Sequence, residues 1–276
     1  MLIVTRRSFL ASSSALVASP LLTRLKASPA PAHDPGSRDL AVALSPSFPT
    51  QEPDLVREMV SVSHGNLARV KELVALHPAM ARAAWDWGYG DWEDALGAAS
   101  HVGHHEIAAV LLANGARPTM YSAAMLGQVD VVKAFITASP GIQRTKGPHG
   151  ITLMAHAVNG GPGAVTVVEY LRSVGDADAK PATEDLSAEQ MDTLVGTYTF
   201  GSASDERMEV SKTSGAKPNL QITRAGRVPR GLAHVGALAF FPAGAEAVRI
   251  RFTESATGIT LTIHDPDVVL TAVKGK

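Results

Sequence analysis

A segment led by glycine recurs four times in the middle of this 276-residue chain. In each copy a large apolar residue follows the glycine at the eighth position, and the apolar residues between them fall at helical spacing. The glycines are Gly65, Gly103, Gly127 and Gly163, and the apolar residues are Leu73, Leu111, Phe135 and Leu171. Because such self-similarity is typical of stacked repeats, it predicts helix-turn-helix units in which each glycine ends a short helix in a backbone conformation that other residues resist.

Two stretches of this repeat resemble ankyrin units. Residues 150–161, GITLMAHAVNGG, match the ankyrin pattern G-x-T-P-L-H-x-A-A-x-x-G with Thr152 and Ala157 in register, although its Pro and His positions hold Leu153 and Ala155. Residues 103–116, GHHEIAAVLLANGA, match the second half of a unit more closely. The resemblance covers about residues 54–180 and implies an α-solenoid of about four units that binds a protein partner through its concave face.

The spacing of the marker glycines departs from a regular ankyrin array. Successive glycines are 38, 24 and 36 residues apart, against about 33 in the family. The 24-residue step leaves only residues 117–120 before the next helix, so we expect one hairpin finger to be missing there. The 38-residue step adds WDWGYGDWED after Ala84, which predicts an enlarged finger.

The enlarged finger is the strongest candidate contact surface. It holds all three tryptophans of a chain with only 5% aromatic residues. Rigid aromatic side chains bury area at little entropic cost and favour partner binding, but the same rings could instead cover the helices beneath them. Together with positions that ankyrin units use for contacts, the predicted partner-binding residues are Trp85, Trp87, Tyr89, Trp92, His101, Tyr121 and Met125.

Histidines provide the only candidate metal ligands that the sequence suggests. His101, His104 and His105 form an H-x-x-H-H cluster across a helix-ending glycine. Because no further ligands can be identified, a structural role is the favoured interpretation. His149 and His156 fall in the fourth unit, and His156 takes a normally apolar helix position, which favours a hydrogen-bonded core histidine over a general base. The sequence therefore predicts no catalytic residue and no cofactor.

The C-terminal part, residues 181–276, changes from helical spacing to alternation of apolar and polar residues. The alternating segments are residues 195–200, 208–212, 220–222, 238–241, 248–252, 259–263 and 268–273. Turn residues separate them every eight to twelve positions, which predicts a small antiparallel barrel or sandwich and an α+β multidomain chain. VGTYTFG at 195–201 and the closing segment 259–274 resemble the lipocalin-like domain appended to bacterial serine hydrolases. The G-x-S-x-G nucleophile motif of such hydrolases is absent from this sequence.

The first 32 residues resemble a twin-arginine signal peptide. TRRSFL at residues 5–10 precedes a weakly apolar run at 11–22 and a small-residue site at 30–32. The run is too short to span a bilayer, so we expect cleavage near Ala32 and a periplasmic or extracytoplasmic protein with no membrane span. Residues 33–53, rich in Pro and Ser, are expected to form a linker.

Composition narrows the function further. A net charge of −1 provides no field that would attract nucleic acid. The absence of cysteine excludes disulfides and thiolate sites. The leading hypothesis is an exported ankyrin-repeat scaffold that binds a protein partner through its concave face and aromatic loop. The alternative is a small-ligand-binding protein or a metal-dependent enzyme that uses the C-terminal barrel, where a small apolar ligand could bind, or an interdomain pocket.

Overall fold

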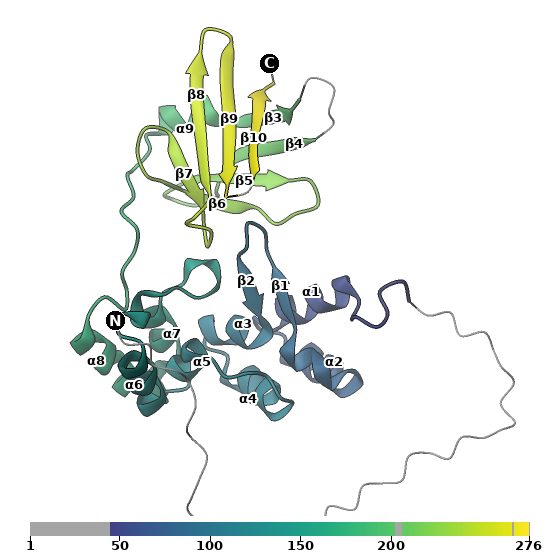
Figure 1. The fold of residues 1–276 in the computed structure, drawn as a ribbon, viewed down its shortest axis with the longest axis vertical. Helices are drawn as coiled ribbons and strands as arrows, with labels where there is room; N and C mark the ends of the chain where they lie inside the picture. Colours follow the sequence, from purple (N-terminus) through teal and green to yellow (C-terminus); the bar gives the residue numbers. More distant parts are fainter. Residues whose placement is uncertain (1–44, 202–205, 267, 276) are drawn as a thin grey trace, which may run out of the picture. The chain divides into compact units, whose positions relative to one another are not determined.

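The computed structural model describes residues 45–201, 206–266 and 268–275. The predicted signal peptide and most of the predicted linker lie outside these residues. Within them the fold is α+β, with helices in the first part of the described chain and a closed eight-stranded antiparallel barrel in the last part (Figure 1). No helix in these described ranges has the length and apolar character needed to cross a membrane.

The first part is built from helices connected by short turns. The α-helices are α1 (Pro53–Val62), α2 (Leu67–Leu76), α3 (Ala95–His101), α4 (His105–Ala113), α5 (Met120–Met125), α6 (Val129–Ala138), α7 (Leu153–Asn159) and α8 (Val165–Val174), followed by α9 (Ala188–Leu194). Four 3₁₀ turns accompany them: η1 (Pro78–Arg82), η2 (Ile142–Arg144), η3 (Pro148–Gly150) and η4 (Gly161–Ala164). Helices α1, α3, α5 and α7 contact one another in a row, and α3 also contacts α7 directly, so the first helices of the pairs lie next to each other.

Capping residues and glycines set the ends of these helices. Thr119 caps α5 by accepting a hydrogen bond from the Ser122 backbone, which satisfies an amide that has no partner within the helix. Gly103 and Gly127 have left-handed backbones, and a Cβ on either would come within 2.1 Å of a backbone oxygen of the α7–α8 pair. Gly65 and Gly163 do not have positive φ angles, so the predicted special conformation is confirmed at two of the four glycines.

The apolar periodicity correctly predicts most of the helical core. Leu73, Leu111 and Leu171 are fully buried. Phe135 is the exception, because 41% of its surface is exposed. Helix α6, which carries Phe135, buries only Val132.

A short hairpin interrupts the helices between α2 and α3. Strands β1 (Ala84–Asp86) and β2 (Trp92–Asp94) pair antiparallel, with Trp85 opposite Glu93. This hairpin is the enlarged finger predicted from the sequence. Asp94 at its end caps α3 by accepting a hydrogen bond from the Gly97 amide, so the hairpin is fixed to the start of α3.

The barrel has strands β3 (Gly196–Phe200), β4 (Arg207–Lys212), β5 (Leu220–Arg224), β6 (Arg230–His234), β7 (Ala239–Pro242), β8 (Arg249–Ser255), β9 (Gly258–Asp265) and β10 (Val268–Lys274). Strand β10 pairs with both β3 and β9 and closes the sheet, so the chain forms a barrel and not a sandwich. Strand β6 was not predicted. Two of its three inward positions are Arg230 and His234, so it lacks the apolar alternation that marks the other strands.

Candidate metal centre

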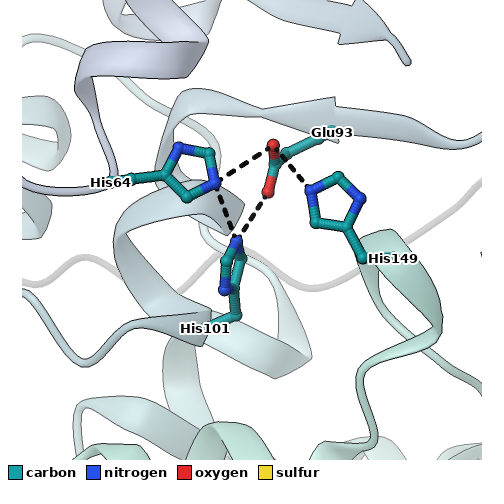
Figure 2. Close-up of side chains that lie close together, drawn as sticks. All are labelled: His64, Glu93, His101 and His149. Atoms are coloured by element: carbon teal, nitrogen blue, oxygen red, sulfur yellow. Dashed lines mark hydrogen bonds and ion pairs between the residues drawn. The ribbon is translucent and has the colours of Figure 1, made fainter. Parts of the chain in front are cut away.

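Four potential metal ligands converge in the helical part of the chain: His64, Glu93, His101 and His149. Figure 2 shows the three imidazole rings directed at the carboxylate of Glu93. One ligand atom from each residue lies within 4.8 Å of all the others. The four residues are far apart in sequence, so the fold and not a local motif brings them together.

Each ligand is placed by the end of an element or by a short strand. His64 follows α1, and His101 is the last residue of α3. Glu93 lies in the middle of β2, and His149 lies in the η3 turn before α7. His149 has a φ of 60°, a left-handed conformation that is costly for a residue with a side chain. Such a conformation persists only where the surroundings fix it, and here Asp91 does so.

Glu93 is the centre of the group and is almost completely buried. Its Oε1 lies 2.9 Å from Nε2 of His101, and its Oε2 lies 3.3 Å from Nε2 of His149 and 3.6 Å from Nε2 of His64. The Trp87 indole donates a 2.8 Å hydrogen bond to Oε2. A buried carboxylate is costly unless it is paired and hydrogen-bonded, and these partners meet that need.

The outer nitrogens of two rings already have acceptors. Nδ1 of His64 lies 3.0 Å from the Ser61 carbonyl oxygen, and Nδ1 of His149 lies 2.8 Å from a carboxylate oxygen of Asp91. Carbonyl and carboxylate oxygens only accept, so both Nδ1 atoms carry a proton, and each of these rings can bind a metal through Nε2 once Nε2 is deprotonated. Metal-binding histidines show this arrangement, because the outer hydrogen bond fixes the tautomer and orients the ring.

The spacing of the inner atoms fits a first-row metal ion. The Nε2 atoms of His101 and His64 are 3.0 Å apart. In a tetrahedral zinc site with bonds of about 2.0–2.1 Å, neighbouring ligand atoms are separated by about 3.3 Å. The separations of 2.9 to 3.6 Å between the two carboxylate oxygens of Glu93 and the histidines lie around that value. One ligand atom from each residue lies within 4.8 Å of the others, so ligands at the wider separations would move closer together around an ion.

The electrostatics keep the carboxylate ionised. Burial raises the pKa of Glu93, but hydrogen bonds from His101 and His149, together with the charges of His149 and His64, outweigh it and lower the pKa to about 2. Burial lowers the pKa of His149, but its hydrogen bonds to Asp91 and Glu93 outweigh it and raise the pKa to about 9. The site therefore stabilises positive charge beside a fixed negative charge, as a cation site must.

Asp91 connects this group to the barrel. It accepts hydrogen bonds from both the backbone N–H and Nδ1 of His149, each 2.8 Å long. Arg230 on β6 donates to the same carboxylate. A shift of Asp91 would therefore move a candidate ligand and a buried arginine of the barrel together.

The structure divides the predicted aromatic contact residues among different roles. Trp87 bonds to Glu93, and Trp85 and Trp87 pack on the helical core. Tyr89 packs on the barrel core, where its hydroxyl lies 4.0 Å from the Met208 sulfur. Only Trp92 is largely exposed among the four, at 64%. Three of the four rings therefore cover other parts of the protein, the alternative interpretation that the sequence had left open.

The predicted histidine cluster is divided as well. His101 belongs to the four-residue group, whereas His104 accepts from the Ile107 amide at the start of α4 and His105 contacts the Gly160 carbonyl oxygen at 3.0 Å. The structure thus does not bring His104 and His105 into the group. Among the other predicted contact residues, Met125 is fully buried in the core.

His156 is a hydrogen-bonded core histidine, as predicted. Its Nδ1 lies 2.8 Å from the Ser100 hydroxyl, and it is fully buried. Burial and the nearby His101 lower its pKa to about 3, so it is neutral. Tyr121 packs against it with ring centroids 5.0 Å apart, and burial raises the Tyr121 pKa to about 12.

Three of the four ligands, His64, Glu93 and His149, were not among the metal-ligand candidates that the sequence suggested. His64 directly precedes Gly65, much as His101 precedes Gly103. Their equivalent positions in successive units were the signal that could have paired them.

No family model matches the chain, and no curated protein shows significant similarity to it.

Proposed function

We propose that this protein binds a divalent transition-metal ion, and that Zn²⁺ fits the site best. The observation that carries the proposal is the convergence of three Nε2 atoms on one buried carboxylate, with the outer nitrogens of two rings already bonded. Imidazole and carboxylate together suit zinc and neighbouring first-row metals. The proposal differs from the expectation of no cofactor, which rested on a different set of histidines.

The number of protein ligands favours a structural metal. Four ligands complete a tetrahedral shell, as in structural zinc sites, whereas catalytic zinc keeps one position for water or substrate. A metal here would join the end of α1, the hairpin, the end of α3 and the η3 turn, and would stabilise their arrangement.

A catalytic metal is the second candidate, because His64 and His149 are each partly exposed and could leave room for an added ligand. Cobalt(II)-substituted protein distinguishes the two roles. A closed four-ligand site keeps its visible absorption spectrum when azide is added. A site with an open position changes its spectrum.

The binding proposal is tested on the full chain by zinc titration after chelator treatment. We expect one equivalent of zinc to bind, with the affinity weakened at least a hundredfold in His101→Ala and in Glu93→Gln. His264→Ala is the matched control, because His264 is an exposed histidine on β9. Zinc binding of unchanged affinity in both substituted proteins would place the metal elsewhere.

We also propose that the helical pairs form an ankyrin-like stack and that the chain is exported. The row of contacts among α1, α3, α5 and α7 and the two left-handed glycines support the stack, and the twin-arginine resemblance supports export. A protein partner stays a separate prediction, for which the exposed Trp92 is the best contact candidate. Loss of a specific partner in pull-downs with Trp92→Ala would support it.

A further inference from the structure

A cavity of about 460 Å³ lies where the β1–β2 hairpin meets one end of the barrel. Pockets that bind small molecules measure about 300–1,000 Å³, so this cavity is large enough for one. It is separate from the metal candidate, because none of the four proposed metal ligands lines it.

One side of the cavity is apolar. The hairpin contributes Trp85 and Tyr89, and the barrel contributes Ile222, Ile263 and Leu270. The barrel interior beyond Ile222 and Ile263 is filled by a packed core that includes Tyr198, Phe240 and Phe252. A ligand would therefore bind against the hairpin and the barrel end, not inside the barrel.

The polar part of the lining contains more arginines than acids, although three of the arginines are paired with acids outside it. Four arginines line the cavity, Arg57, Arg224, Arg227 and Arg230, against Asp86 and Asp265. Arg57 and Arg224 have acidic partners outside the lining, namely Asp54 and Glu206. Among the described residues Arg227 forms no ion pair, so its charge is available at the rim.

Arg230 carries an unmet hydrogen-bond donor. Its terminal nitrogen Nη2 donates to Asp91 and to the Ala243 carbonyl oxygen. Its Nε is buried and has no hydrogen-bond partner among the described residues, while Arg230 as a whole is only 8% exposed. A buried N–H without an acceptor is destabilising, and because Arg230 also lines the cavity, an anion that draws its guanidinium toward the cavity would give this donor an acceptor.

We propose that this cavity binds an amphiphile with one anionic head group, a carboxylate or a phosphate monoester, and an apolar body. The head group would bind Arg230 and Arg227, because guanidinium groups pair well with both kinds of anion. The apolar body would lie against Trp85, Tyr89 and Ile222. This inference does not depend on the metal site.

The test uses dodecanoate and dodecyl phosphate, titrated below their micelle concentrations into the full-length protein. Calorimetry and tryptophan fluorescence report binding, because Trp85 and Trp87 line the cavity. We expect one equivalent of at least one anion to bind at least tenfold more tightly than dodecanol or dodecyltrimethylammonium. The tighter of the two anions identifies the head group. The proposal is overturned if neither anion binds, or if the cation binds equally well.

Substitutions locate the site. Leu270→Glu places a negative charge in the lining at a residue that is 45% exposed, so the fold should tolerate it, and we expect anion binding to weaken at least tenfold. Thr271→Glu adds the same charge to the neighbouring exposed position outside the lining and should bind as the unaltered protein does. Arg227→Gln should also weaken binding. Equal affinities for Leu270→Glu and Thr271→Glu would refute the location.

Discussion

Replacing Glu93 by glutamine should greatly weaken metal binding while nearly preserving side-chain shape. Structural zinc sites bind with about 10–16 kcal/mol at neutral pH. If four ligands share that equally, one ligand contributes about 2.5–4 kcal/mol, which corresponds to a loss of affinity of about 10²- to 10³-fold. Glu93 is the only anionic member of the group, so its share should lie at the upper end.

The same substitution should destabilise the chelator-treated protein at pH 7. The pKa of Glu93 is lowered from 4.5 to about 2. Its ionised form therefore stabilises the fold above pH 4.5, and this contribution is lost as the pH falls through 2. Because 1.36 kcal/mol corresponds to a tenfold change in proton affinity, the loss in Glu93→Gln is at most about 3 kcal/mol.

Competition with a chromophoric chelator measures the affinity, and urea unfolding measures the stability. Glu169→Gln is the matched control, because Glu169 is an exposed glutamate on α8 and should change neither quantity. The reasoning is refuted if Glu93→Gln binds zinc within threefold of the unaltered protein, since Glu93 would then not be a ligand.

Three further predictions concern the surroundings of the site. In chelator-treated protein, the pKa of His149 is raised from 6.5 to about 9. The protonated ring therefore stabilises the fold by at most about 3 kcal/mol. This contribution is complete below pH 6.5 and is lost as the pH rises through 9. Urea unfolding at pH 6.5 and 9 checks this, and equal stabilities after correction with His149→Gln would contradict it. Asp91→Asn removes the carboxylate that orients His149 and should weaken zinc binding about 10- to 100-fold, measured by chelator competition. An unchanged affinity would show that Asp91 does not orient the ligand. Ser100→Ala removes the hydroxyl bonded to Nδ1 of the buried His156 and should lower the free energy of unfolding by about 1–3 kcal/mol, measured by urea unfolding. A loss below about 0.5 kcal/mol, as for typical surface substitutions, would argue that water replaces the hydroxyl.

Local patterns in the sequence predicted much of the fold. Alternation at residues 248–252 identified β8, because each inward residue of that strand is apolar, as Ile250 and Phe252 show. Strand β6 escaped detection because its inward positions include Arg230 and His234, whose burial depends on contacts made only in the folded protein. A pattern of hydrophobicity cannot reveal a strand whose core-facing residues are polar.

The candidate site was harder to predict because its ligands have no fixed spacing. Among them only His101 belonged to the sequence-based metal candidates, and its neighbours His104 and His105 point to other partners. The finger also carries two acids, Asp91 and Glu93, that are buried, although acidic side chains are rarely buried unless they are paired. Which acids turn inward depends on the register of the hairpin, where Trp85 lies opposite Glu93.

The row formed by α1, α3, α5 and α7 has a consequence for how this chain could change in length. Arrays of helical pairs commonly gain or lose whole units, because each unit contacts only its neighbours. Here His64 follows the first helix of the row, His101 ends the second and His149 precedes the fourth. Inserting or deleting a helical pair between these points would shift the ligands relative to one another by about the width of a unit. A working metal site would therefore fix the number of units between α1 and α7, and this part of the chain could not vary as a modular array does.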